Sequence, residues 1–209
     1  MTEATMSHAA SSPHTPQVFE ESPFSIPSKK LAMWLFIMSD IMTLAACFAA
    51  YAFLRNATPD WPRPFHSMTT VAVMTFLMLT TCLTMLIGLQ AAQAGDKAGA
   101  FRWIMITGAG GLVFAGLHIR EWMQMMAQGV GLFHNPWGTS AFGAAYYSIT
   151  GFSLLHIGVG SIALLIVGIR YQGGRYKAND IEIMNLYWQF VSLAWLFIVP
   201  AVYLMNMAR

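Results

Sequence analysis

Residues 140–169 read SAFGAAYYSITGFSLLHIGVGSIALLIVGI, and this stretch decides the fold because it contains no Asp, Glu, Lys or Arg. A helix needs about 20 apolar residues to cross the hydrocarbon core of a bilayer. Four further apolar segments of sufficient length occupy residues 31–54, 68–90, 102–124 and 183–205. These runs are too long, and alternate too little, to be the strands of a membrane barrel. The sequence therefore predicts an all-α, polytopic membrane protein with five transmembrane helices.

Composition supports the same class. The chain has 209 residues, of which 56% are hydrophobic and 10% charged, whereas a typical soluble domain contains about 25% charged residues. The formal net charge of +2 is too small to indicate nucleic-acid binding. Residues 1–30 are polar, contain four prolines and have no apolar core. We therefore expect a disordered N-terminal tail at 1–30, followed by a five-helix transmembrane domain at 31–209.

The distribution of Lys and Arg predicts the orientation. With five crossings, the N-terminal tail, the second loop and the fourth loop share one side of the membrane. That side and its flanks hold seven Lys and Arg residues, and the opposite side holds four. Because Lys and Arg are enriched in cytoplasmic loops, we expect the N-terminus in the cytoplasm and the C-terminus outside.

Small residues recur at helical spacing in the third and fourth segments. Such residues let helix backbones approach closely in lipid, where no hydrophobic force drives helices together. The glycines that we expect to serve helix packing are Gly108, Gly111, Gly151, Gly158 and Gly160.

Asp40 is the one charged side chain expected well inside an apolar segment. It lies about 14 Å along the first helix, counted from Leu31 at 1.5 Å per residue, and so near the middle of the bilayer. A carboxylate there costs a few kcal/mol and needs a partner. His156, deep in the fourth segment, can lie at the same depth. We interpret Asp40 and His156 as a proton-linked intramembrane pair, with hydrogen-bonded packing as the alternative.

No metal site and no catalytic centre is expected in this chain. Two histidines that ligate one haem must project to one point. His118 is expected near the end of its helix, whereas His156 lies about 24 Å from the corresponding end of the fourth helix. The 16 methionines can bind Cu(I), but methionine commonly fills gaps between apolar helices.

Four separated stretches carry family motifs. They are LAMWLFIMSD at 31–40, HIREW at 118–122, TGFSLLH at 150–156 followed by Gly160, and YWQFVSLAW at 187–195 followed by Tyr203. In this order, over about residues 31–205, they resemble subunit III of the haem-copper terminal oxidases, the cytochrome c and quinol oxidases. The five crossings match the five-helix form of that family.

The resemblance also marks individual residues. Asp40 stands at the family's intramembrane acid, and His156 is retained as well. The further polar motif positions are His118, Glu121, Thr150 and Gln189. The sequence departs from the usual pattern where His118 replaces Gln, Ser153 and Gln189 replace His, and Ser192 replaces Asp.

The resemblance implies a non-redox accessory subunit of a proton-pumping oxidase that reduces oxygen to water. The implied location is the bacterial inner membrane. The implied partners are the catalytic haem-copper subunit I, subunit II, other complex subunits and membrane lipids. Haems and copper are expected in those partners, phospholipid on this chain, and support for proton uptake as part of its role.

Two other interpretations remain open from the sequence. One is a subunit III-like protein of nitric oxide reductases, which the departures in the last two helices favour. The other is an independent ion or metal transporter. A transporter would have several ionisable residues along an intramembrane path, whereas the sequence places one there.

Overall fold

The computed structural model describes residues 27–208, so residues 1–26 of the tail predicted at 1–30 lie outside the described part. Five long helices dominate this part: α1 (Ser28–Ala57), α2 (Thr69–Gln93), α3 (Lys97–Ala127), α4 (Ser140–Gln172) and α5 (Ala178–Ile198). All five are long and apolar enough to cross a membrane. Within residues 27–208, extended pairing is limited to an isolated bridge between Phe65 and Met207. The predicted all-α fold with five transmembrane helices is confirmed.

Helices α1 and α3 extend beyond the apolar segments from which they were predicted. The first begins at Ser28 rather than at residue 31, and α3 continues to Ala127 rather than ending at 124. A helix need not end where its hydrophobic run ends, because its polar turns can emerge from the bilayer. Where α3 and α4 do end, Gly129 and Gly174 follow with φ of 80° and 74°, a conformation that glycine adopts without strain.

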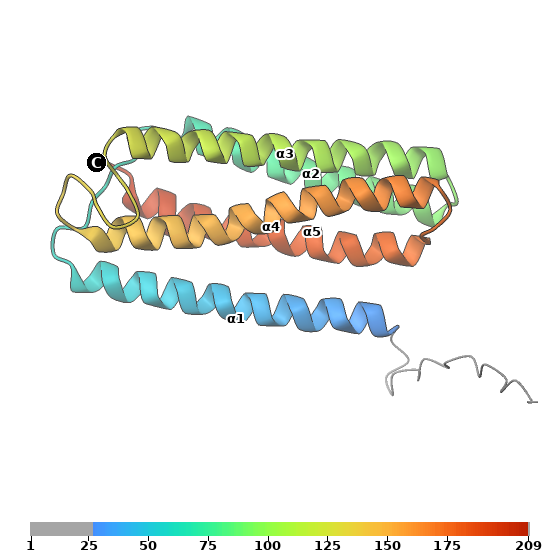
Figure 1. Ribbon diagram of the computed structural model, residues 1–209, viewed down its shortest axis with the longest axis horizontal. Coiled ribbons are helices and arrows are strands. Elements are labelled where there is room, and N and C mark those ends of the chain that lie inside the picture. Colours follow the sequence, from blue (N-terminus) through green and yellow to red (C-terminus); the bar gives the residue numbers. More distant parts are fainter. Residues whose placement is uncertain (1–26, 209) are drawn as a thin grey trace, which may run out of the picture.

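Successive helices run in opposite directions (Figure 1). The start of α1 and the α2–α3 and α4–α5 connections lie at one end of the bundle, which we call the basic end. The α1–α2 and α3–α4 connections and the C-terminus lie at the opposite end. Two ion pairs join α1 to α5 at the basic end: Lys29 with Asp180 at 3.0 Å, and Lys30 with Glu182 at 2.6 Å.

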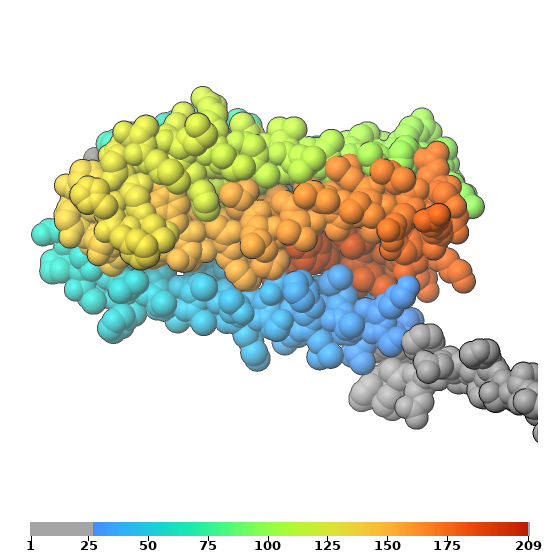
Figure 2. All heavy atoms as spheres, in the orientation of Figure 1, coloured from blue at the N-terminus to red at the C-terminus, as the bar shows by residue number. Residues whose placement is uncertain are grey.

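Helix α1 forms one side of the bundle (Figures 1 and 2). It packs against α4 and α5, while α2 and α3 pack on the far side of those helices. Its central span has a smaller buried share than that of any other helix. The contacts of α1 with α4 and α5 therefore hold this helix in the bundle.

Indole groups hold α5 to α2. Trp188 donates from Nε1 to the hydroxyl of Thr81 at 3.2 Å, and Trp195 donates to Thr75 at 3.1 Å. Both indoles are fully buried. Hydrogen bonds between helices stabilise packing inside a membrane, where apolar burial contributes little.

The last helix changes its geometry near its end. After α5, residues Val199–Tyr203 form a π-helical turn, η1, and Leu204–Asn206 form a 3-10 turn, η2. Pro200 has no N–H with which to continue the α-helical ladder, so a widened turn is accommodated here. The amide of Asn206 then donates to the hydroxyl of Tyr51, which ties this end to α1.

Candidate functional site

Asp40 and His156 meet between α1 and α4. Oδ2 of Asp40 lies 3.0 Å from Nε2 of His156. The Asp40 residue is only 8% exposed, although it belongs to the least covered helix. The structure thus brings together the two residues that the sequence analysis placed at one depth.

The second nitrogen of His156 fixes the protonation pattern of the pair. Nδ1 lies 2.8 Å from the carbonyl oxygen of Phe152, one turn earlier in α4. A carbonyl only accepts, so Nδ1 carries a hydrogen and a neutral imidazole has its lone pair on Nε2. Nε2 therefore faces the Asp40 carboxyl, in a geometry that suits either Asp–OH beside neutral His156 or carboxylate beside imidazolium.

The surroundings of the pair are mostly apolar. His156 lines a small hollow with Leu44, Phe190 and Ile198. The hydroxyl of Tyr187 donates to the carbonyl oxygen of His156 at 2.9 Å, which fixes this part of α4 against α5. The Asp40–His156 contact thus lies where few other polar groups surround it.

A groove between α1 and α5 leads from this hollow toward the C-terminal end of the bundle. The hollow adjoins an apolar cavity of about 310 Å³, with which it shares Leu44 and Phe190. That cavity in turn adjoins one of about 370 Å³, with Phe48 and Phe197 between them. The groove was not predicted, because its walls come from opposite ends of the sequence.

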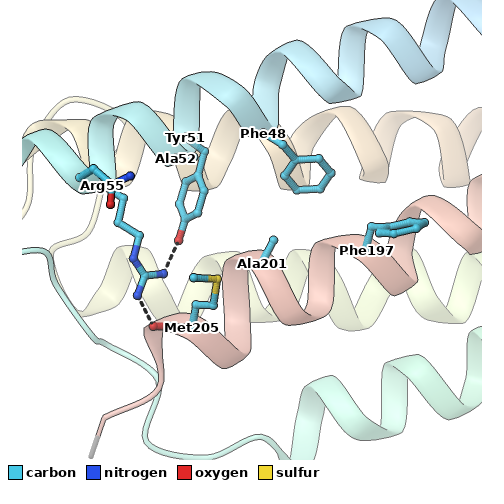
Figure 3. Close-up of a pocket in the computed structure, with 8 residues that line it drawn as sticks. Phe48, Tyr51, Ala52, Arg55, Phe197, Ala201 and Met205 are labelled. Atoms are coloured by element: carbon cyan, nitrogen blue, oxygen red, sulfur yellow. Dashed lines mark hydrogen bonds between the residues drawn. The ribbon is translucent and has the colours of Figure 1, made fainter.

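Arg55 closes the outer end of the groove (Figure 3). Its guanidinium donates to the carbonyl oxygen of Met205 at 2.8 Å and to the hydroxyl of Tyr51 at 3.4 Å. Within residues 27–208, Arg55 forms no ion pair with a carboxylate. The positively charged side chain of Arg55 therefore lies at one end of the apolar groove.

Glu121 corrects one expectation from the sequence. The sequence analysis expected Asp40 to be the one charged side chain well inside an apolar segment. In the structure α3 continues beyond Glu121, this residue is 7% exposed, and its Oε2 accepts from the hydroxyl of Tyr203 at 3.2 Å. A second carboxylate therefore lies inside the bundle, near the end opposite the basic end.

His118 is also fully buried rather than at the helix boundary. Its ring lies among Phe114, Trp122 and Trp195, with centroid distances of 5.4–5.9 Å. Within the described residues, neither ring nitrogen has a hydrogen-bond partner. His118 and His156 have separate neighbours, and the described residues contain no group of three or more His, Cys, Asp or Glu that could hold a metal ion.

The other motif residues hold helices together. The hydroxyl of Thr150 accepts from the indole of Trp122 at 3.1 Å and donates to the Tyr146 carbonyl. The amide of Gln189 donates to the carbonyl oxygen of Cys82 at 3.2 Å, which joins α5 to α2. Both contacts join neighbouring helices.

The five glycines differ in what their absent side chains face. A Cβ at Gly108 would meet Leu165, one at Gly111 would meet Ser161 and Trp188, one at Gly151 would meet Trp122, and one at Gly160 would meet Tyr187. A Cβ at Gly158 would meet no heavy atom within 4 Å. Four of the positions thus face another side chain closely, while the packing role expected for Gly158 stays a prediction.

Comparison with known proteins shows that the chain is similar to subunits of respiratory oxidases. The model of the family described as cytochrome c oxidase subunit III matches residues 23–207. The chain is 31% identical to a cytochrome c oxidase subunit 3 of Bacillus sp. strain PS3, over 86% of this chain and 87% of the relative. It is 30% identical to a quinol oxidase subunit 3 of Bacillus spizizenii, over 85% and 87%. It is 29% identical to a cytochrome bo(3) ubiquinol oxidase subunit 3 of Pseudomonas aeruginosa, over 83% of each chain.

Proposed function

Since the chain belongs to the cytochrome c oxidase subunit III family, we propose that, as the accessory subunit III of a haem-copper terminal oxidase, it supports proton uptake through Asp40 and His156. The observation that carries this proposal is the 3.0 Å contact between Nε2 of His156 and Oδ2 of Asp40. A contact of this length in an apolar setting suits a pair that holds one proton between its two bases. Intramembrane acids of this kind typically belong to proton relays or to polar contacts with a neighbouring subunit.

The groove between α1 and α5 supports a structural role for lipid. An acyl chain fits the apolar wall formed by residues such as Phe48 and Phe197. The guanidinium of Arg55 at the mouth suits the phosphate of the same lipid, because a charge-assisted hydrogen bond to phosphate is stronger than a neutral one. A lipid held here would also exclude water from the side of the bundle that contains His156.

The redox chemistry is assigned to partner subunits. We expect the catalytic subunit I to carry the haems and copper, with subunit II and other subunits completing the complex. The multi-pass chain is expected in the inner membrane of a bacterium. The basic end, with residues such as Lys29, Lys97 and Lys177, is then expected in the cytoplasm and the C-terminus outside.

Removing the subunit from the oxidase tests the proposal. Oxidase purified without this chain should reduce oxygen at first and then lose activity during turnover, or take up protons more slowly. Adding the wild-type chain back should restore both properties. The measurements are oxygen consumption over many turnovers and proton uptake in reconstituted vesicles.

Two outcomes would contradict the proposal in different ways. If oxidase without this chain has full and stable activity and unchanged proton uptake, the chain acts only in assembly. Complete loss of initial activity, with haems and copper still present in the remaining complex, would mean that an essential transfer step runs directly through this chain.

A further inference from the structure

A polar pocket of about 240 Å³ lies beside Glu121, between the start of α2 and the end of α3. Its polar lining residues are His66, Ser67, Thr70, Glu121, Gln124 and Gln128. Gln124 and Gln128 are exposed, so the pocket reaches the surface of the chain. It lies at the end of the bundle that carries the α1–α2 connection and the C-terminus (Figure 1). Neither Asp40 nor His156 lines it.

The carboxyl group of Glu121 joins this pocket to two buried phenols. Its Oε2 accepts from the hydroxyl of Tyr203 at 3.2 Å. Tyr146 of α4 packs against Tyr203, with the two ring centroids 6.0 Å apart. Glu121 is buried, and both tyrosines are fully buried. The carboxyl group therefore has an open pocket on one side and phenol groups of the bundle interior on the other.

No positive charge balances a Glu121 carboxylate, because this residue forms no ion pair within residues 27–208. Its sequence neighbour Arg120 is exposed. The titratable groups near Glu121 are Tyr203 of η1, Tyr146 of α4, His66 of the α1–α2 connection and His118 one turn earlier on α3. The part of α2 that lines the pocket, Thr70 and Val71, has no titratable group. Because an unpaired buried charge is costly, a carboxylate here depends on hydrogen bonds.

The hydroxyl of Tyr146 points to a second state of this site. It is buried and has no hydrogen-bond partner within residues 27–208. Buried polar groups are nearly always hydrogen-bonded, so a lone exception calls for a physical reason. A neutral carboxyl group needs little beyond the bond from Tyr203, whereas a carboxylate has two oxygens that only accept. Tyr146 is the further donor that a charged Glu121 would need.

We propose that Glu121 is a second proton-binding site of this chain, which exchanges its proton with the aqueous phase at the C-terminal end of the bundle through the pocket. The neutral carboxyl group accepts from Tyr203 and carries its own hydrogen on the other oxygen. On ionisation this proton passes to water in the pocket, and the hydroxyl of Tyr146 turns to donate to the carboxylate. Both phenols keep their hydrogens. The site does not depend on the Asp40–His156 pair, so it goes beyond the proposed function.

Infrared difference spectroscopy of the full-length chain in detergent, titrated from low to high pH, tests the site. A protonated carboxyl group has a C=O stretching band that disappears on ionisation, and subtracting a variant from the wild type isolates the band of one residue. Glu121→Gln should remove one such band. Asp40→Asn changes the pair on which the proposed function rests and should leave the Glu121 band in place. In heavy water the Glu121 band should shift promptly, because the pocket admits solvent.

Two adjacent tyrosines offer matched variants. Tyr146→Phe removes a hydroxyl that makes no hydrogen bond here, so Tm should stay unchanged. The pH midpoint of the Glu121 band should nevertheless rise by about one to two units, as expected for the loss of one hydrogen bond to a charged group. Tyr147→Phe removes a hydroxyl that donates to the Val130 carbonyl at 2.6 Å. It should lower Tm and leave the midpoint unchanged.

Four results would overturn the proposal. The first is a titration in which Glu121→Gln loses no carboxyl band. The second is an unchanged midpoint in Tyr146→Phe, which decides the question even if Glu121→Gln fails to fold. The third is a Glu121 band that does not shift in heavy water, which would exclude exchange through the pocket. The fourth is loss of the same band in Asp40→Asn, which would assign the signal to the Asp40–His156 pair.

Discussion

Nε2 of His156 lies 3.0 Å from Oδ2 of Asp40, and this contact joins α1 to α4. The opposite nitrogen of His156 is engaged by its own helix at Phe152. The imidazole ring is therefore held in one orientation, with Nε2 toward Asp40.

Asp40→Asn should preserve assembly and alter proton handling. The amide of asparagine can donate to Nε2 of a neutral His156, so the contact between α1 and α4 is kept while the acidic carboxyl group is lost. We expect slower proton uptake or faster loss of activity during turnover, measured in reconstituted oxidase. Asp60→Asn, an exposed change, is the control. Wild-type behaviour of Asp40→Asn in both measurements would reduce Asp40 to a packing residue.

Asp40→Ala should weaken the attachment of α1. Truncation leaves Nε2 of His156 without its partner in a mostly apolar place, at a cost of about 1–3 kcal/mol. The double variant Asp40→Ala/His156→Phe should be less destabilised than the sum of the two single variants, because the unpaired imidazole is then absent. The measurement is the thermal unfolding in detergent of the wild type, the two single variants and the double variant. Strict additivity would mean that the two residues do not interact energetically.

Gly160→Ala should destabilise the bundle, whereas Gly158→Ala should not. A Cβ at Gly160 would lie 2.6 Å from Cε1 of Tyr187, the residue whose hydroxyl bonds to the His156 carbonyl. Overpacking of this kind costs about 1–3 kcal/mol. A Cβ at Gly158 meets open space in the isolated chain. The measurement is Tm in detergent, and equal Tm values for the two variants would contradict the close approach at Gly160.

The isolated chain should carry no redox centre. His118 is enclosed by aromatic rings and His156 is engaged by Asp40 and Phe152, so the two imidazoles are not arranged around one haem. Once the other subunits are removed, we expect no Soret band in the optical spectrum and no stoichiometric copper by elemental analysis. A haem that remains bound to the purified chain would refute this.

Much of the fold followed from hydropathy, because each apolar segment can satisfy its backbone inside a bilayer only as a helix. Counting residues along straight helices also placed Asp40 and His156 at compatible depths. Both residues lie far from the helix ends, so an error of a few residues in the helix boundaries changes their relative depth little.

The same counting did not reveal the burial of Glu121. Arg120 and Glu121 are adjacent and charged, and such a pair ordinarily marks the end of a membrane segment. Neighbouring residues on a helix point about 100° apart, so Arg120 faces outward while Glu121 faces Tyr203. Which of the two is buried depends on the rotation of α3, which is set by its neighbours.

The cavities could not be predicted for a related reason. Arg55 and Met205 are far apart in the sequence and meet at the mouth of one groove. Thr70 and Glu121 likewise line one pocket from two different helices. Hydrophobic periodicity describes each helix alone, whereas these sites arise from the way in which the helices pack.

The π-helical turn at Val199–Tyr203 divides the last membrane crossing into two parts whose side chains point in different directions around the helix axis. Before it, Trp188 and Trp195 face α2. At its last residue, Tyr203 faces Glu121, and after it Asn206 faces Tyr51. A widened turn accommodates one extra residue, and one residue corresponds to about 100° of rotation. Deleting a single residue here would therefore swing the final two turns around the helix axis and separate Tyr203 from Glu121. The indole contacts upstream would stay in place. The rotation of the terminal segment about the helix axis is therefore set separately from that of α5.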